Sequence, residues 1–478
     1  MNKCFWASLI FSLTASLSGA QALPSEIDAA LARAKVPREA VAVLVVEAQS
    51  KAGPLVSHRA GVAMNPASLM KLVTTYAALD LLGPAFTWTT PVFVEGAVRD
   101  GTLFGNLYIK GQGDPKLVSE RLWLLLRRVQ GLGVKTIAGD IVLDKSAFEN
   151  VEVDPSLFDG EPLRPYNAAP DALLLNFKAV VMTFVPDRTA NTAQIQFEPP
   201  LAGVQMQHSV PLSDAPCGDY RAALKADFSD PVAIRFGGTY YFNCGEKVWG
   251  VAYADPKSYA TRAIEGMWRE MGGKLAGSVR AGTVPATLTR PAFEISSPPL
   301  PEVIRDINKY SNNVMAQQLF LTLSMPAKAT ARDSIAPAAQ TATLAASRDA
   351  VQRWWRGAIS TDDLPVLDNG SGLSRTERIS ANALGKLLQS AYASPVMPEL
   401  MSSLPITGVD GTLRGRRSAA RGSAHLKSGT LRDVVGVAGY VLANSGKRYV
   451  VVMIVNQPGA PAARAAIDAL LDWTMREN

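Results

Sequence analysis

The sequence has little histidine and lacks two common hydrolase signatures. Its 478 residues include three histidines, and none lies in an H-E-x-x-H pattern, where two helical histidines bind zinc. No serine stands in the G-x-S-x-G turn that presents the nucleophile of many Ser-His-Asp hydrolases. These absences disfavour a zinc protease and a serine hydrolase of that type. We expect no metal ion and no cofactor.

Cysteine is equally scarce. Of the three cysteines, Cys4 lies in the N-terminal segment, which leaves Cys217 and Cys244 in the body of the chain. The spacing of these two fits neither a zinc site nor a C-x-x-C redox motif. In an exported chain, an even pair suggests a disulfide. Two separate buried thiols are the alternative.

Charge is not concentrated in any segment. The chain has 48 Lys and Arg against 42 Asp and Glu, a formal net charge of +6. The basic residues form no run of the kind that binds nucleic acid, and the charge supports at most a weak attraction to anionic surfaces. We therefore expect no nucleic-acid partner and at most peripheral contact with a membrane.

No long hydrophobic run occurs beyond the N-terminus. There, Lys3 precedes an apolar segment at residues 5–17, and residues 20–22 (Ala-Gln-Ala) form a small-x-small cleavage site. The apolar part is too short to span a bilayer comfortably. The pattern predicts a signal peptide at residues 1–22, cleavage near Ala22 and export to the periplasm.

The most informative stretch is residues 65–71, Asn-Pro-Ala-Ser-Leu-Met-Lys. Ser68 and Lys71 are three positions apart, so on a helix they share one face. Asn65 suits the N-cap and Pro66 the first helical position. Residues 69–82 are apolar nearly all round, which predicts a buried helix.

A lysine at the start of a buried helix has chemical consequences. Burial lowers the pKa of an amine, and a neutral Lys71 could take the proton of Ser68 as its oxygen attacks a carbonyl. The plain alternative is a surface serine and lysine on an ordinary helix. We favour the chemical interpretation because this is the only S-x-x-K in the chain and other polar groups accompany it.

Ser311 and Asn313 form the second polar group, in a turn between two expected helices. Acyl transfer needs a proton relay and groups that hold the substrate, besides a nucleophile and a base. Ser311 could pass the proton to the leaving amine. Asn313 could hold both the substrate amide and Lys71.

Lys427, Ser428 and Thr430 form the third group and lead into an apolar strand. Lys427 offers a fixed cation for an anionic substrate tail. The backbone N–H groups of Ser68 and Thr430 could polarise the carbonyl that is attacked.

A second S-x-N occurs at Ser380-Ala381-Asn382. It opens a helical pattern, so Ser380 is better explained as an N-cap. We therefore assign the second polar group to Ser311.

The pattern of the chain predicts mixed α and β structure. Residues 41–46 are a continuous apolar run typical of a central strand, and two more strands and a helix are expected over 434–475. Between these ends, residues 87–251 contain short alternating segments separated by turns. We interpret this middle part as about two small inserted domains.

The three polar groups match the S-x-x-K, S-D-N and K-T-G motifs of serine β-lactamases and penicillin-binding proteins. The sequence resembles that superfamily, with Ser311-Asn312-Asn313 for S-D-N and Lys427-Ser428-Gly429 for K-T-G. Both departures keep the ends of the motif that carry its function. Ser311 follows Ser68 by more than two hundred positions, so large insertions must separate them.

This layout resembles the D-alanyl-D-alanine carboxypeptidase/endopeptidases of the penicillin-binding protein 4 type, over essentially the whole mature chain. The resemblance also includes residues 111–115, 166–168, 368–374 and 425–431. It implies an α+β fold: a β-lactamase/transpeptidase-like domain, with an antiparallel sheet flanked by helices, and two inserted smaller domains.

The resemblance also implies where these domains lie. The catalytic domain would comprise residues 23–90 and 292–478. The first inserted domain would comprise 91–160 and 248–291, and the second, which is rich in strands, 161–247.

The implied substrate is a peptidoglycan stem peptide ending in D-Ala-D-Ala, or a cross-link containing that bond. An acyl-enzyme would form on Ser68 and then be hydrolysed, and β-lactam antibiotics would inhibit by forming the same bond. The catalytic roles fall to Ser68, Lys71 and Ser311. The binding roles fall to Asn313, Lys427, Ser428 and Thr430.

Two other functions are compatible with these motifs. A β-lactamase would use the same acyl chemistry with fast deacylation, although the insertions argue against it. A wall-binding module with little activity is the other, and the intact Ser68, Lys71 and Lys427 argue against that.

Overall fold

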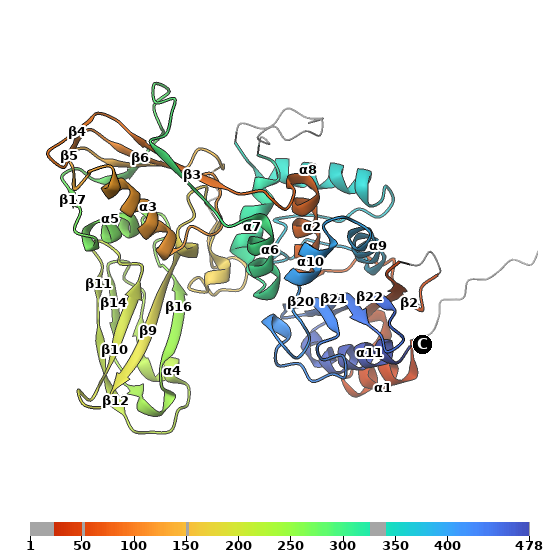
Figure 1. Ribbon diagram of the computed structural model, residues 1–478. Helices are drawn as coiled ribbons and strands as arrows, with labels where there is room; N and C mark the ends of the chain where they lie inside the picture. Colours follow the sequence, from red (N-terminus) through yellow and green to blue (C-terminus); the bar gives the residue numbers. More distant parts are fainter. Residues whose placement is uncertain (1–22, 50–52, 150–152, 326–340, 478) are drawn as a thin grey trace, which may run out of the picture.

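The computed structural model describes residues 23–49, 53–149, 153–325 and 341–477. The expected signal peptide lies outside these residues. The chain forms a body in which helices cover both faces of a sheet, and a second lobe built largely of strands (Figure 1).

The sheet of the body unites the two ends of the chain. It has five strands in the order β2-β1-β22-β21-β20, and every pairing in it is antiparallel. The expected antiparallel sheet flanked by helices is thereby confirmed. Its strands are β1 (Val41–Glu47), β2 (Val56–His58), β20 (Ala424–Leu431), β21 (Val434–Leu442) and β22 (Arg448–Asn456).

Apolar residues on both faces of this sheet explain why its strands read as continuous hydrophobic runs. In β1, Leu44 and Val46 join the core beneath α2 (Met70–Leu82) and α9 (Ala381–Tyr392). Val43 and Val45 point the other way, because side chains alternate along a strand. The helices on that second face are α1 (Ser25–Arg33) and α11 (Arg464–Arg476).

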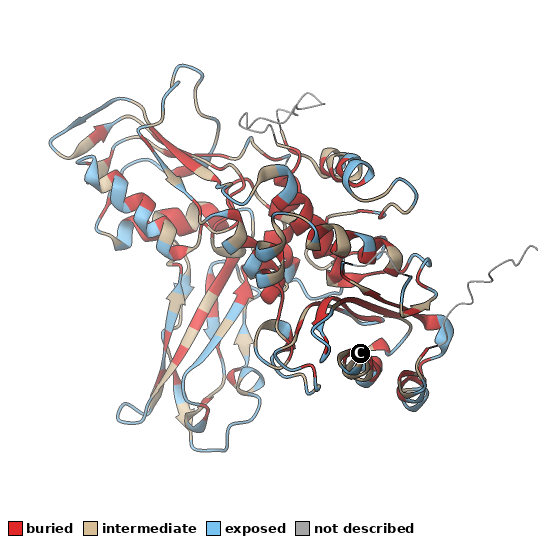
Figure 2. Ribbon diagram, turned by 45° about the vertical axis from the view of Figure 1, so that its right-hand side comes forward, coloured by how far each residue is buried: buried red, intermediate tan, exposed pale blue. Residues whose placement is uncertain are grey.

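Helix α2 is the centre of the body. Its residues from Met70 to Leu79 are all buried, as the apolar pattern predicted, and Figure 2 shows buried residues gathered around it. Further helices pack around α2. They are α6 (Leu300–Lys309), α7 (Asn313–Thr322), α8 (Leu344–Ala358) and α10 (Met397–Ser403).

The part of the second lobe next to the body contains two sheets and two helices. One sheet has the order β18-β8-β6-β3-β19 and the other β17-β7-β5-β4. The elements are β3 (Thr89–Val94), β4 (Ala97–Arg99), β5 (Thr102–Phe104), β6 (Leu107–Lys110), α3 (Ser119–Gly131), β7 (Thr136–Ile137), β8 (Ile141–Asp144), α5 (Tyr259–Glu270), β17 (Lys274–Leu275), β18 (Val279–Ala281) and β19 (Phe293–Ser296).

The far part of the lobe is a long sheet, β15-β12-β10-β9-β16, with a smaller sheet, β11-β14-β13. Cys217 and Cys244 are bonded to each other here, which confirms the expected disulfide. The elements are β9 (Ala179–Asp187), β10 (Thr192–Glu198), β11 (Gln205–Met206), β12 (Ser209–Ser213), α4 (Tyr220–Leu224), β13 (Ala226–Asp227), β14 (Ala233–Phe236), β15 (Tyr240–Tyr241) and β16 (Lys247–Ala252).

Two strand pairings involve residues at the domain limits expected from the sequence. β16 pairs with β9, so residues 247–252 belong to the sheet of the far part. β19 pairs with β3, so residues 293–296 belong to the sheet next to the body. The limits of the three domains given in the sequence analysis stay a proposal. Within the described residues, no helix has both the length and the apolar character needed to cross a membrane.

Candidate active site

Ser68 lies on a short 3-10 turn, Ala67–Leu69, directly before α2. We expected Pro66 to open the helix, but it precedes this turn and Ala67 adopts a left-handed φ of 48°. The Asn65 carboxamide accepts a hydrogen bond from the Ala67 N–H at 2.9 Å. The turn lifts Ser68 out of the regular helix, so that its side chain reaches the cavity while its neighbours on either side are buried.

Lys71 is fully buried on the first turn of α2 and contacts three oxygens. Its Nζ lies 3.0 Å from Ser68 Oγ and 2.6 Å from Asn313 Oδ1. It also donates to the backbone carbonyl of Ser371. The spacing that predicted a shared helical face for Ser68 and Lys71 therefore yields direct contact.

Electrostatics favour the neutral amine at Lys71. Burial lowers its pKa well below 10.5, and the positive charge of Lys427 lowers the pKa further. The negative charge of Glu377 acts in the opposite direction. Lys71 is thus suited to accept a proton, since an amine must be neutral to act as a base.

Ser311 lies in the short link between α6 and α7, and Asn313 is the first residue of α7. Asn312 caps α7 by accepting the Met315 N–H at 3.0 Å. Ser311 adopts a left-handed φ of 56°, which turns the chain sharply ahead of that cap. The two neighbours of Asn312 consequently contact different partners: Asn313 contacts Lys71, and Ser311 contacts Lys427.

Lys427 is fully buried on β20, the edge strand of the body sheet. Its Nζ donates to Ser311 Oγ at 2.9 Å and to the Ser428 carbonyl at 2.8 Å. Burial lowers the pKa of Lys427 to about 7. Lys427 therefore gains or loses its positive charge near neutral pH.

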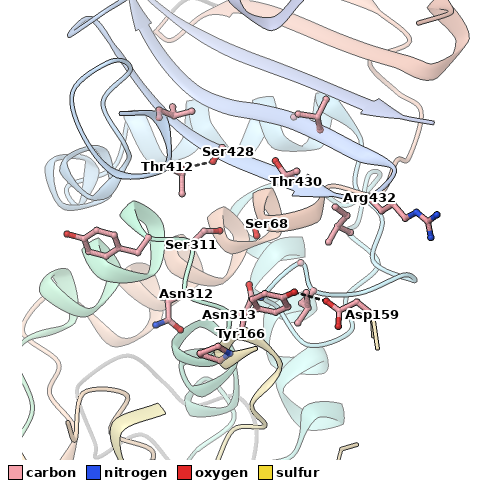
Figure 3. A pocket seen from close by; sticks show the side chains of 18 of the residues that line it. Ser68, Asp159, Tyr166, Ser311, Asn312, Asn313, Thr412, Ser428, Thr430 and Arg432 are labelled. Atoms are coloured by element: carbon pink, nitrogen blue, oxygen red, sulfur yellow. Dashed lines mark hydrogen bonds between the residues drawn. The ribbon is translucent and has the colours of Figure 1, made fainter. Parts of the chain in front are cut away.

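A cavity of about 1370 Å³ opens over these groups. Ser68, Ser311, Asn313, Ser428 and Thr430 all line it, and Figure 3 shows them converging from the turn before α2, the α6–α7 link with the start of α7, and β20. The structure thus brings together the residues that the sequence singled out, with Lys71 and Lys427 buried directly beneath the cavity wall.

The competing S-x-N motif lies elsewhere. The Ser380 hydroxyl accepts the Ala383 N–H at 2.9 Å and so caps α9, as expected from its sequence context. Ser380 is fully buried and absent from the lining of the cavity.

Sequence reasoning missed the role of the loop at residues 368–374. The stretch was named only as part of the family resemblance, with no role given to it. In the structure the Ser371 carbonyl holds Lys71. A side chain at Gly372 would lie 1.9 Å from the Ala67 carbonyl oxygen, so the loop packs directly on the Ser68 turn. Only the run of glycines hinted at such a close approach.

The sequence also gave no indication of the charged outer wall of the cavity. Asp159 accepts a hydrogen bond from Tyr166 Oη at 2.8 Å on this wall (Figure 3). Arg375 lies there as well and forms an ion pair with Asp433 at 3.0 Å. The wall therefore offers both signs of charge beside Ser68, although no motif joins these segments.

The sequence is similar to those of known D-alanyl-D-alanine carboxypeptidases. The chain is 27% identical over 488 residues to a D-alanyl-D-alanine carboxypeptidase of Actinomadura sp. strain R39, covering 95% of this chain and 85% of that protein. It is 26% identical over 400 residues to the D-alanyl-D-alanine carboxypeptidase of Haemophilus influenzae, covering 82% and 80% of the two chains.

The fold agrees with these relatives. The crystal structure of penicillin-binding protein 4 from Haemophilus influenzae superposes with a TM-score of 0.71 at 22% identity, covering 94% of this chain and 99% of that one. A second structure of that protein, complexed with a β-lactam, gives a TM-score of 0.68 at 22% identity, with 94% and 100% covered. The expected penicillin-binding-protein fold is confirmed.

The sequence profile of the D-Ala-D-Ala carboxypeptidase 3 (S13) family matches residues 23–477, a range that includes every described residue. Together with the fold and the two carboxypeptidase relatives, this match identifies the chain as a serine peptidase. The chain belongs to the D-Ala-D-Ala carboxypeptidase 3 (S13) family.

Proposed function

We propose that this peptidase cleaves D-Ala-D-Ala bonds of peptidoglycan stem peptides, and the corresponding bonds of cross-links, through an acyl-enzyme on Ser68. The observation that carries the proposal is the 3.0 Å contact between Ser68 Oγ and a fully buried Lys71 amine. A serine hydroxyl becomes a strong nucleophile when an adjacent base takes its proton.

The partners of Lys71 set the direction of proton transfer. A neutral amine has two N–H donors and one lone pair. Asn313 Oδ1 and the Ser371 carbonyl can only accept, so they take the two donors. The lone pair is then directed at Ser68, whose hydroxyl can donate. As Ser68 Oγ bonds to the substrate carbonyl carbon, its proton passes to Lys71 Nζ.

The leaving group needs a proton and a clamp. When the tetrahedral intermediate collapses, the C–N bond breaks, and the proton that Lys71 took from Ser68 passes through the Ser311 hydroxyl to the leaving amine, which leaves Lys71 neutral again. Lys427 lies 2.9 Å from Ser311 Oγ and in its charged form attracts the terminal carboxylate of the leaving D-alanine. Ser428 and Thr430 continue this polar edge along β20. Water then hydrolyses the ester on Ser68 and releases the shortened peptide.

This chemistry also explains why we expect inhibition by β-lactams. A β-lactam presents its strained amide carbonyl to Ser68 and its carboxylate to Lys427. When the amide bond breaks, the leaving nitrogen stays attached to the acyl group through the rest of the molecule. We further propose that the protein acts in the periplasm after cleavage of its signal peptide near Ala22, since peptidoglycan lies outside the cytoplasmic membrane.

The proposal is tested by mass spectrometry of the products formed from purified cross-linked muropeptides. We expect release of D-alanine and of separated monomers by the wild-type protein. Ser68→Ala should give neither product and should not be labelled by a fluorescent penicillin. Ser380→Ala is the matched control: it removes the hydroxyl of the other S-x-N motif and should keep both activities.

Two outcomes would contradict the proposal. Persistent labelling of Ser68→Ala would overturn the assignment of the nucleophile. Sustained turnover of nitrocefin by the wild type, in place of a single burst, would indicate a β-lactamase.

A further inference from the structure

Glu377 is a fully buried carboxylate that the mechanism above does not use. Its Oε1 accepts three backbone N–H groups, from Asp368 at 3.1 Å, Asn369 at 3.2 Å and Gly370 at 2.9 Å. Successive N–H groups that converge in this way form an anion-binding nest. The carboxylate therefore fixes the start of the loop at residues 368–374 from behind.

That loop holds the catalytic elements at three points. The Gly370 carbonyl accepts from Thr74 Oγ1 at 2.6 Å, and the Ser371 carbonyl accepts from Lys71 Nζ. The Ser374 carbonyl accepts from the Asn65 amide at 3.0 Å. The loop thus contacts the Ser68 turn and the first two turns of α2 together, and a displaced loop would release Lys71.

The second carboxylate oxygen makes Glu377 more than an anchor. Glu377 Oε2 is buried, and no hydrogen-bond partner for it is found among the described residues. Burial raises the pKa of Glu377 to about 7, so the carboxylate is charged above that pH and neutral below it.

The charged groups around Glu377 are few. Lys71 on α2 is the buried cation that the charge of Glu377 affects. Lys427 on β20 also faces Lys71, but burial alone accounts for its lowered pKa. Asp368 in the loop repels Glu377, and Arg348 on α8 contacts Asp368 from outside. Removal of the Glu377 charge should therefore be felt mainly at Lys71.

We propose that Glu377 is a positioning residue for the acylation step: it anchors the 368–374 loop so that the Ser371 carbonyl aims Lys71 at Ser68. The inference rests on the proposed role of Lys71 as the base. It adds a carboxylate that never touches the substrate and yet holds the base in position.

The test is the rate of acylation by a fluorescent penicillin, measured over the pH range in which each protein stays folded. Glu377→Gln keeps an acceptor oxygen for the three N–H groups but removes the charge. Lys71 then loses a neighbour that raises its pKa. Because the pKa of Glu377 is about 7, the change also removes a group that titrates in this range, and the acid limb of the profile should move to lower pH. The alkaline limb, where the acylation rate falls because Lys427 loses its positive charge, should not move.

Two further variants control this result. Glu377→Asp keeps the charge on a shorter side chain, so the acid limb should stay near its wild-type position while the rate falls. Asp80→Asn removes a carboxylate from the other end of α2, where Asp80 Oδ2 accepts from Trp354 Nε1 at 2.8 Å, and should change neither the limb nor the rate.

The outcomes separate this inference from the proposed function. If penicillin does not acylate the wild type at all, the proposed function fails. If the wild type is acylated and Glu377→Gln has the same acid limb, the inference is overturned and Glu377 is only a structural residue. Should Glu377→Gln not fold, a wild-type rate in Glu377→Asp would overturn it.

Discussion

The active site and the second lobe bury lysines in opposite ways. In the lobe, Lys178 lies 3.2 Å from the Asp171 carboxylate, which is also paired with Lys145 at 2.8 Å. In the active site, Lys71 and Lys427 contact only hydroxyl, amide and carbonyl oxygens, and neither forms a salt bridge within the described parts of the chain.

The difference teaches what each lysine can do. Burial lowers the pKa of Lys178, but Asp171 raises it and so works against the loss of the charge. No carboxylate contacts Lys71 directly, so desolvation dominates and favours the neutral base. We conclude that the lysines of the lobe hold structure and those of the site carry chemistry, and four predictions test that contrast.

The largest effect is expected for Lys71→Met, which keeps much of the volume and removes the base. Acylation by penicillin should slow by about 10²- to 10⁴-fold, the usual contribution of a positioned base. Stopped-flow fluorescence with labelled penicillin measures this rate. An acylation rate within a few-fold of wild type would show that Lys71 is not the base.

The next largest effect is the alkaline loss of activity on substrates with a free carboxylate. The pKa of Lys427 is about 7, so its charge is present below that pH and disappears above it. The value of kcat/KM should therefore fall as pH rises past about 7, by up to about tenfold per unit. A peptide with an amidated C-terminus should lack this limb, and an identical limb for both substrates would contradict the role of Lys427.

A smaller effect, on stability alone, is expected for Asp171→Asn. The change leaves Lys145 and Lys178 close together without their shared carboxylate. The free energy of unfolding at neutral pH should decrease by about 1–3 kcal/mol, while penicillin labelling of the folded protein is unchanged. Urea titration measures the decrease. If the folded variant were no longer labelled by penicillin, the lysine cluster of the lobe would not be purely structural.

The pH dependence of that difference has a definite sign. Burial opposes ionisation of Asp171, but Lys178 and Lys145 outweigh it and hold its pKa below 3.8. A carboxylate with a lowered folded pKa stabilises above its unfolded value and loses this contribution as pH falls through the folded one. Wild type and Asp171→Asn should therefore converge in stability below pH 3.8.

The smallest effect is expected for Lys178→Met. Asp171 keeps its contact with Lys145 at 2.8 Å, so a single hydrogen bond to a charged group is lost. The free energy of unfolding should decrease by about 1 kcal/mol with no change in acylation. A loss larger than that of Asp171→Asn would show that the cluster is not organised around its carboxylate.

The motifs of the site could be found in the sequence because they depend on side chains at fixed local spacing. Ser68 and Lys71 are one helical turn apart, and Lys427 stands directly before Ser428 on an apolar strand. The helix at residues 70–82 and individual strands of the body sheet follow from apolar patterns. The union of both chain ends in one domain was implied by the family resemblance.

The remainder of the site depends on contacts that leave little trace in a sequence. The acceptor at Ser371 is a backbone carbonyl, which every residue carries. The sequence around Glu377 does not indicate that this carboxylate is buried, and its partners are backbone N–H groups. Asp159 and Arg375 reach one cavity from segments more than two hundred residues apart, so only the tertiary fold reveals them.

The central claim is that Ser68, activated by Lys71, forms the covalent bond to the substrate carbonyl. Peptide mapping by mass spectrometry after reaction with penicillin tests it most directly. Trypsin should release residues 60–71, which contain Ser68, with the mass of the added penicilloyl group, and fragmentation should place that group on Ser68. An adduct on a peptide that contains Ser311 or Ser380, with residues 60–71 unmodified, would contradict the account.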